Sequence, residues 1–125
     1  MAGLAYFPLS FEEISRVTSP DGAVDAVMIQ DNCGAPCSFG YSVFIVPKGQ
    51  SAPRDFEQDV FHADSMADEK LGWRPERVLE IAYRKAEIYK FRNISYPLGE
   101  YGAKEKNWEY RVEVRLAPSP GSALR

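Results

Sequence analysis

The sequence contains few of the residues on which most enzyme and metal sites depend. Its 125 residues include one histidine and two cysteines. A Ser/His or Cys/His mechanism would have to use His62, and a zinc site built from four cysteine and histidine ligands cannot be assembled. We therefore expect neither a metal site nor a cofactor.

An excess of positive charge is also lacking. The chain has 15 Lys and Arg residues against 18 Asp and Glu residues, which gives a net charge of -3 with the histidine neutral. Nucleic-acid-binding domains usually carry a clustered excess of Lys and Arg, so we expect no nucleic-acid partner. A run of about 20 apolar residues, which a membrane-spanning helix requires, is missing as well.

What the chain does contain is enough apolar sequence for one core. Apolar residues make up 45% of the composition, which is typical of a globular domain of this length. We expect a single β-rich domain at residues 10–117. Residues 118–125 are rich in Pro, Ser and Gly, and we expect them to form a disordered tail.

The first nine residues, MAGLAYFPL, are apolar but lack the charged start and the cleavage site of a signal peptide. Two interpretations are open. Residues 1–9 pack on the domain, or they are the remnant of a membrane anchor or leader, with a tether upstream. The second interpretation places the protein in the cell envelope or periplasm, whereas the first is compatible with the cytoplasm.

Several short apolar segments, bounded by turn signals, predict β-strands. They lie at residues 24–29, 41–46, 60–64, 78–83 and 87–94. The first two flank a long connection and predict a hairpin. The last two are joined by residues 84–86 and predict a second, tighter hairpin.

Residues 108–116 give the clearest strand signal, because apolar residues occupy the even positions and charged residues the odd ones. This alternation is typical of antiparallel sheets with one buried side and one wet side. We predict that Val112 and Val114 face the core, while Arg111 and Glu113 face water. The expected fold class is mainly β, as a single antiparallel β-sheet or a small sandwich of about 5–7 strands.

Local signals add one helix and several turns. Residues 10–13 have the form of a capping box, with Ser10 at the N-cap and Glu13 three positions later, and they predict one short N-terminal helix ending at about Arg16 or Val17. Ser-Pro-Asp-Gly at residues 19–22 predicts a turn. We expect a helical turn or loop at 66–72 and a turn at 73–76.

The candidate site is the connection QDNCGAPCSFGY at residues 30–41, which holds both cysteines. We predict that Asn32 caps backbone donors, that Gly34 takes a conformation a side chain would oppose, and that Cys33 packs as a small buried side chain. The candidate binding residues are Asn32, Cys33, Gly34, Phe39 and Tyr41. Cys33 and Cys37 form a local disulfide or stay two free thiols, and a reactive thiol is a third alternative.

A catalytic alternative uses Cys33, His62 and Asp64. His62 and Asp64 are two positions apart, so they share one side of the predicted strand. If His62 approached a cysteine or a serine while Asp64 oriented its ring, the chain would be a small thiol enzyme or hydrolase. A structural or solvent-facing histidine is the simpler interpretation.

Two further sets of residues are candidate sites. Glu109 and Glu113, with Arg111 between them, suit a surface charge ladder better than the acid pair of a glycosidase. The large aromatic residues belong to a core or form a carbohydrate platform, and core is the commoner role. They are Phe44, Trp73, Tyr83, Tyr89, Phe91 and Trp108.

The order of several motifs resembles a small bacterial domain family of unknown function, over residues 19 to about 92. The motifs are SPDG at 19–22, NCGA at 32–35, VPKG at 46–49, VFHADS at 60–65 and W-x-x-x-x-V-L-E-I-A-Y at 73–83. The family continues its NCGA motif with Thr-Thr where this chain has Pro36 and Cys37, so Cys37 departs from the pattern.

Members of such families often begin with a membrane anchor or lipoprotein leader, so the resemblance implies an envelope location. It implies no activity. We therefore expect a non-enzymatic, envelope-associated interaction or binding module, whose partner is a protein or an envelope component.

Overall fold

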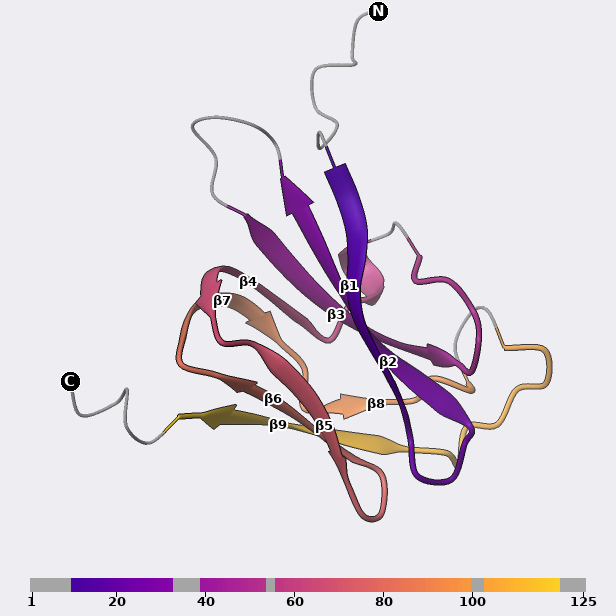
Figure 1. Cartoon of the computed structure of the whole chain (residues 1–125). Helices are drawn as coiled ribbons and strands as arrows, with labels where there is room; N and C mark the ends of the chain where they lie inside the picture. Colours follow the sequence, from indigo (N-terminus) through magenta and orange to yellow (C-terminus); the bar gives the residue numbers. More distant parts are fainter. Residues whose placement is uncertain (1–9, 33–38, 54–55, 100–102, 120–125) are drawn as a thin grey trace, which may run out of the picture.

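The computed structural model describes residues 10–32, 39–53, 56–99 and 103–119, which form two packed β-sheets (Figure 1). The described strands are β1 (Ser10–Thr18), β2 (Val24–Asn32), β3 (Gly40–Pro47), β4 (Phe61–Ala67), β5 (Lys70–Arg74), β6 (Val78–Tyr83), β7 (Lys85–Phe91), β8 (Ile94–Ser95) and β9 (Val112–Pro118). A short 3-10 turn, η2 (Phe56–Gln58), precedes β4. The mainly β prediction is confirmed, with more strands than the 5–7 expected.

One sheet has five strands in the order β1-β2-β3-β4-β7, and all its neighbours are antiparallel. The other has four strands in the order β5-β6-β9-β8. Within the described residues no helix has the length and apolar character needed to cross a membrane. Residues 1–9 and 120–125 lie outside the described part of the chain.

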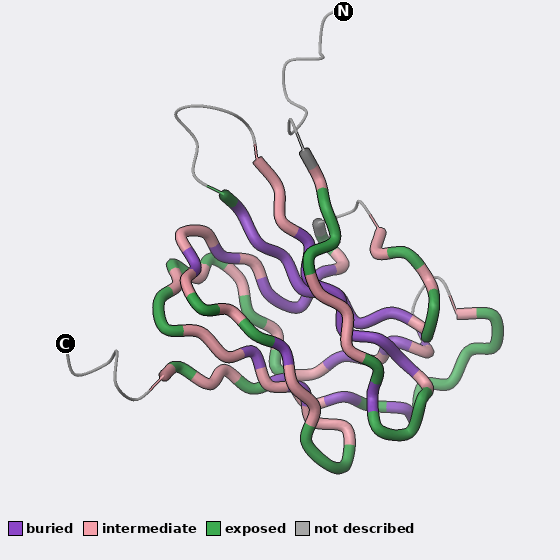
Figure 2. The backbone as a smooth tube through the Cα atoms, viewed as in Figure 1, coloured by how far each residue is buried: buried purple, intermediate pink, exposed green. Residues whose placement is uncertain are grey.

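The core lies between the two sheets, where the buried segments of β2, β3, β6 and β9 meet (Figure 2). Both sheets contribute side chains that are fully buried. They include Met28, Val43 and Phe61 from the five-stranded sheet and Leu79, Ile81, Val112 and Val114 from the four-stranded sheet. The predicted burial of Val112 and Val114 is therefore confirmed, and Arg111 is exposed as expected.

The predicted N-terminal helix is wrong, because residues 10–18 form the edge strand β1. β1 pairs with β2 from Ser10 opposite Asn32 to Thr18 opposite Asp25, with a bulge at Ile14. A helix of two turns is marginal by itself, whereas β1 gains a full ladder of backbone hydrogen bonds. The turn at residues 19–22 is confirmed, and it closes the β1–β2 hairpin with Gly22 at a φ of 76°.

The first predicted hairpin, β2–β3, is confirmed, but the second is wrong. β6 pairs with β5 and β9, whereas β7 pairs with β4 in the other sheet. The chain crosses between the sheets at Arg84, so alternation identified the strands but not their partners. The loop expected at residues 66–72 is confirmed only at Asp68 and Glu69, because the other residues belong to β4 and β5, and the turn after β5 comes at residues 75–77.

The antiparallel prediction fails for the longest pairing of β9. β9 runs parallel to β6 from Val78 opposite Glu113 to Tyr83 opposite Pro118, and it is antiparallel only to the short β8. Parallel strands are usually buried on both sides, but here Arg115 remains exposed on the outer side. A sheet that is open to water on one side therefore produces the same alternation in a parallel pair.

Candidate functional site

The five-stranded sheet has an outer face, which is the side turned away from the four-stranded sheet. Along β2, β3 and β4 this face carries every second residue. They are Asp25, Val27, Ile29, Asp31, Gly40, Ser42, Phe44, Val46, His62 and Asp64. The centre of this set is apolar, and each end of β2 places one aspartate beside it.

The apolar residues form a second, smaller core. Phe44 and Val27 are almost completely buried there, together with Ile29 and Val46. Phe11 from β1 and Ala52 from the loop after β3 pack against them. This part of the outer face is thus covered by the protein itself.

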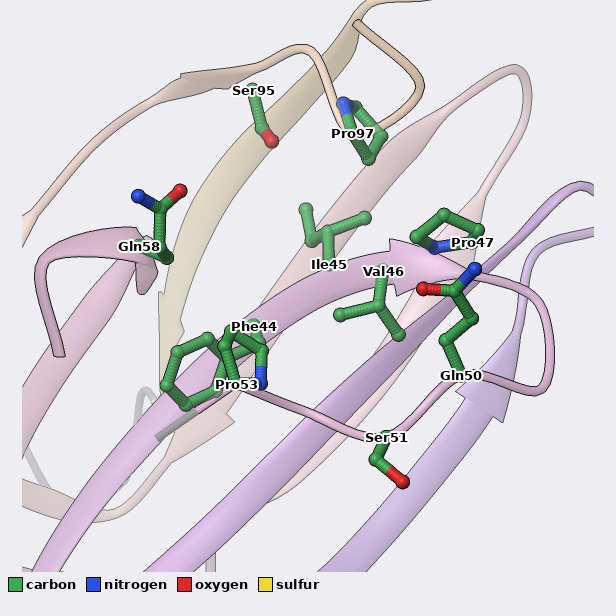
Figure 3. Close-up of a pocket in the computed structure, with 10 residues that line it drawn as sticks. All are labelled: Phe44, Ile45, Val46, Pro47, Gln50, Ser51, Pro53, Gln58, Ser95 and Pro97. Atoms are coloured by element: carbon green, nitrogen blue, oxygen red, sulfur yellow. The ribbon is translucent and has the colours of Figure 1, made fainter. Parts of the chain in front are cut away.

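A pocket lies beside the smaller core, where β3 continues past its pairing with β4 (Figure 3). Its volume is about 60 Å³. Its walls are Phe44, Ile45, Val46, Pro47, Gln50, Ser51, Pro53, Gln58, Ser95 and Pro97. Sites for metabolites and cofactors usually measure several hundred Å³, so this pocket has room for roughly two water molecules and not for a substrate.

Asp25 lies at the end of β2 that adjoins this covered core, and its carboxylate is fully bonded. It accepts hydrogen bonds from Thr18 Oγ1 at 2.6 Å, from the Arg16 guanidinium at 2.7 Å and from the Gly49 amide at 3.0 Å. Burial raises the pKa of Asp25, but these hydrogen bonds and the charge of Arg16 outweigh burial and hold the pKa below its ordinary value. Asp25 therefore ties β1, β2 and the loop after β3 together.

We call the opposite end of the outer face the acidic end. It consists of Asp31, Gly40, His62, Asp64, Glu87 and Tyr89. Asp31 is partly buried, and within the described residues its carboxylate has no hydrogen bond or ion pair. Burial raises the pKa of Asp31, and the nearby His62 offsets only part of this effect. Asp31 is thus partly desolvated without the bonds that stabilise Asp25.

Gly40 explains how Asp31 reaches its position. Gly40 pairs with Asp31 on one side and with Asp64 on the other, so the three lie in one row across β2, β3 and β4. A Cβ atom at position 40 would lie 2.8 Å from Asp31 Oδ1. The Asp31 carboxylate therefore occupies the space above Gly40, with Asp64 on the far side of that glycine.

Tyr89 adds an exposed aromatic ring to the acidic end. Its side chain is 64% exposed, and its hydroxyl lies 3.4 Å from Asp64 Oδ2 and 3.5 Å from Glu87 Oε1. The ring centre is 6.3 Å from that of His62. The negative charge of Asp64 raises the pKa of Tyr89.

His62 does meet a serine, as the catalytic alternative required, but not in a catalytic arrangement. Ser42 Oγ lies 2.9 Å from His62 Nδ1, and Asp59 Oδ2 lies 3.9 Å from the same nitrogen. In a catalytic triad the serine and the aspartate approach opposite ring nitrogens. Ser42 is also fully buried, so its hydroxyl is out of reach of a substrate.

Asp59 lies just before β4 and is fully buried. Its Oδ1 accepts a hydrogen bond from Lys90 Nζ at 2.7 Å, and Lys90 also donates to the Glu57 carbonyl at 3.2 Å. Asp59 Oδ2 has no hydrogen-bond partner in the described part of the chain. A buried carboxylate with one oxygen unbonded is costly, which makes this aspartate unusual for a purely structural residue.

The structure describes only some of the predicted binding residues. Cys33, Gly34 and Cys37 lie outside the described residues, so the disulfide, the thiol chemistry and the distance to His62 stay predictions. Asn32 ends β2, and Phe39 is 46% exposed just before Gly40.

Tyr41 instead faces the main core with 6% of its surface exposed. Its hydroxyl accepts a hydrogen bond from Gln30 Nε2 at 3.1 Å. A ring buried in this way is not available to a partner. Tyr41 is therefore a core residue.

The sequence did not single out Asp31 or Asp59, and it indicated Tyr89 only as one of the aromatic residues of a core or a carbohydrate platform. One signal was present for Asp31, because it continues in steps of two from Asp25 through Val27 and Ile29 and so must lie on the same face of β2. For Asp59 and Tyr89 no local pattern exists. Tyr89 meets His62 through the pairing of β4 with β7, which joins distant parts of the chain, whereas Asp59 is only three residues before His62.

A polar groove of about 370 Å³ lies on the other sheet and contains both glutamates of the glycosidase interpretation. It is lined by Glu76, Arg77, Val78, Glu109, Arg111 and Glu113. The hydrogen bond from Arg115 lowers the pKa of Glu113, whereas the acid of a glycosidase needs a raised pKa. A ladder of surface charges describes this groove better.

The aromatic residues do not assemble into one platform. Phe44, Trp73 and Tyr83 pack in or against the two cores. Tyr89 and Phe91 are exposed on β7, while the exposed Trp108 lies beside Tyr96, with the ring centres 6.2 Å apart.

No group of three or more His, Cys, Asp or Glu side chains among the described residues is arranged to hold a metal ion. Comparison with protein-family models, with curated proteins and with solved structures finds no match to this chain. The functional argument therefore depends on the acidic end itself.

Proposed function

We propose that this protein is a binding module of the cell envelope, and that a protein partner docks on the acidic end. The observation that carries the proposal is the contrast along β2. Asp25 is bonded by three donors, whereas Asp31 is partly buried with no bonded partner in the described part of the chain. Partial burial of an unbonded carboxylate costs folding free energy, and such groups are common at functional sites.

The exposed aromatic residues support the same surface. Phe39 precedes Gly40 directly in the chain, and Tyr89 lies beside Asp64. Exposed aromatic side chains that adjoin charged groups are enriched in protein interfaces, where they supply much of the binding energy. The buried Ser42 argues against a hydrolase at this site.

The envelope location rests on the sequence, through the apolar residues 1–9 and the resemblance to an anchored family. β1 starts at Ser10, opposite Asn32, so a tether formed by residues 1–9 would leave the domain at the same end as the acidic surface. Fractionation of cells that express the native gene tests this part. Recovery in the envelope fraction is expected, and recovery only in the cytosol would overturn it.

The binding function is tested by selecting ligands from a displayed library of random peptides on the full chain. We expect enriched peptides that bind the wild type and lose binding to the double variant Asp31→Asn/Asp64→Asn. The matched control is Asp68→Asn, which changes an exposed aspartate in the turn before β5.

Two results would overturn the proposal. One is the enrichment of peptides that bind the double variant as tightly as the wild type, because the acidic end would then not be the docking surface. The other is turnover of ester or thioester substrates that is lost in Cys33→Ser and His62→Gln, because the protein would then be an enzyme.

A further inference from the structure

We propose that a cleft between β1 and β5 binds the single aliphatic chain of an uncharged lipid. The two strands are edges of different sheets, and the cleft between them has a volume of about 330 Å³. It is lined by Ile14, Ser15, Val17, Met28, Glu69, Lys70 and Leu71. None of these residues belongs to the acidic end, so the inference goes beyond the proposed function.

The cleft has the size and the shape of a site for a small linear molecule. Its volume is in the range of several hundred Å³ that ligand sites occupy, which the pocket of about 60 Å³ beside β3 does not reach. The wall on β1 runs from Ile14 to Val17, and three steps of about 3.3 Å give it a length of about 10 Å. Bonds of about 1.5 Å that meet near 111° give an extended chain of about eight carbons a similar length.

The base of the cleft is part of the main core. Met28 is fully buried and Leu71 is 4% exposed, and Val17 packs against the same core. Leu and Val side chains offer no hydrogen-bonding group, and the thioether of Met is only a weak acceptor. The unbranched Met28 side chain is also adaptable, so the base can follow the outline of an inserted chain. The base therefore selects an apolar ligand.

An irregularity in β1 shapes one wall of the cleft. The pairing of β1 with β2 shifts between Glu13 and Ser15, so Ile14 is an extra residue in β1. A bulge of this kind bends the strand and redirects a side chain, and bulges are common beside functional sites. Ile14 is 36% exposed and adds an apolar side chain to the rim of the cleft.

Trp73 joins the two strands at one end of the cleft. Its Nε1 donates a hydrogen bond to the Val17 carbonyl at 2.8 Å. A peptide strand that extended the sheet at β1 would need this carbonyl, so β-strand addition is a poorer match for the cleft. A chain without hydrogen-bonding groups needs no such partner.

The lining residues near the other end carry charges that offset each other. Glu69 and Lys70 are neighbours in the chain and contribute one negative and one positive charge. An anionic or a cationic head group would therefore meet repulsion as well as attraction. The Ser15 hydroxyl can both donate and accept a hydrogen bond. These residues thus match a polar but uncharged head group, such as a hydroxyl or an ester.

The test is an NMR titration of the ¹⁵N-labelled full chain with butanol, hexanol and octanol. We expect shifts at the amides of Ser15, Val17 and Leu71. The indole N–H of Trp73 should shift as well, since it is bonded to a wall of the cleft, whereas that of the exposed Trp108 should not.

The affinity should depend on the length of the chain. Each added CH₂ group should strengthen binding about fourfold, which is the effect of burying one such group. Triethylene glycol is a polar chain of similar length to octanol, and it should leave all these signals in place.

Three variants make the titration specific. Ser15 lies opposite Met28 and shares its side of the sheet, so Ser15→Phe places a ring in the cleft and should weaken octanol binding at least about tenfold. Ile14→Ser removes an exposed apolar side chain from the rim and should weaken binding severalfold. Ser51→Phe is the matched control, because it adds the same ring at an exposed position after β3, and it should leave the affinity within about twofold.

The inference is overturned if affinity does not rise with chain length, if the shifted signals lie elsewhere, or if folded Ser15→Phe binds octanol as tightly as the wild type. If Ser15→Phe does not fold, unchanged binding in Ile14→Ser has the same meaning. Octanoate and octyltrimethylammonium test the uncharged head group. Binding of either one more than about tenfold tighter than octanol would also overturn the inference.

Discussion

Asp25 and Asp31 project from the same face of β2, near its two ends, but their surroundings differ. Asp25 is 2% exposed and accepts hydrogen bonds from β1 and from the loop after β3. Asp31 lies above a glycine, next to a second aspartate across that glycine, and its pKa is raised by burial where that of Asp25 is lowered by bonding. One carboxylate stabilises the fold, and we propose that the other contacts a partner.

The difference follows from what covers each end of the outer face. At the Asp25 end, the loop after β3 returns over Val27, Phe44 and Val46 and brings the Gly49 amide to the carboxylate. At the Asp31 end, the neighbouring residue on β3 is Gly40, which has no side chain to cover the carboxylate. In the described part of the chain, the same alternating strand therefore contributes to a small core at one end and to a polar surface at the other.

The largest expected effect on stability comes from the covered end of the outer face, beside Asp25. Phe44→Ala removes a buried aromatic side chain from the smaller core, and we expect it to lower the free energy of unfolding by about 3–5 kcal/mol. Urea denaturation measures the loss. Tyr89→Ala is the matched aromatic change at the acidic end, and it should cost less than about 1 kcal/mol. Equal losses in the free energy of unfolding for the two variants would show that the covered end and the acidic end contribute equally to stability.

Asp25→Ala should cause the second-largest loss of stability. It leaves Arg16, Thr18 and the Gly49 amide without their acceptor, and we expect a loss of about 3 kcal/mol at neutral pH. Because the folded-state pKa of Asp25 is lowered, its contribution is present above the ordinary value of 3.8 and is lost as the pH falls through the folded-state pKa. Denaturation curves over a range of pH should therefore converge for the variant and the wild type in acid. A constant difference would contradict the ionic role of Asp25.

Much of this architecture could be predicted from the sequence, but only where local pattern decides it. The alternation of residues 108–116 correctly identified Val112 and Val114 as core, and the apolar segments around residues 30–41 correctly predicted the β2–β3 hairpin. The helix at residues 10–17 was wrong because pairing with β2 outweighs a short capping signal.

The acidic end could not be predicted, because it depends on which strands become neighbours. Asp31, Asp64 and Tyr89 come from β2, β4 and β7, and the sequence pattern predicts a pairing of β7 with β6 that the structure does not have. Period-two patterns report the buried side of a strand and carry no information on its partner. His62, which the sequence does indicate as a candidate, lies within this surface.

Lys90→Ala tests the buried charge of Asp59. It leaves Asp59 fully buried without the cation that now lies 2.7 Å from its Oδ1, and we expect a loss of about 2 kcal/mol. The double variant Lys90→Ala/Asp59→Asn should recover part of this loss, because the buried negative charge is then removed as well. Thermal and urea unfolding measure both effects. No recovery in the double variant would mean that Lys90 acts by packing and not by its charge.

The smallest expected effect has the opposite sign. Asp31→Asn removes a partly desolvated charge without breaking a bond in the described part of the chain, so we expect stability at neutral pH to rise by less than about 1 kcal/mol. Since burial raises the folded-state pKa of Asp31, its protonated form contributes stability that is complete below the ordinary value of 3.8 and is lost as the pH rises through the raised pKa. The advantage of the variant should thus appear above that window and vanish in acid, which is the reverse of Asp25→Ala. Urea denaturation of both variants at matched pH values measures the two trends, and a loss of stability at neutral pH in Asp31→Asn would assign Asp31 to the fold and not to a partner.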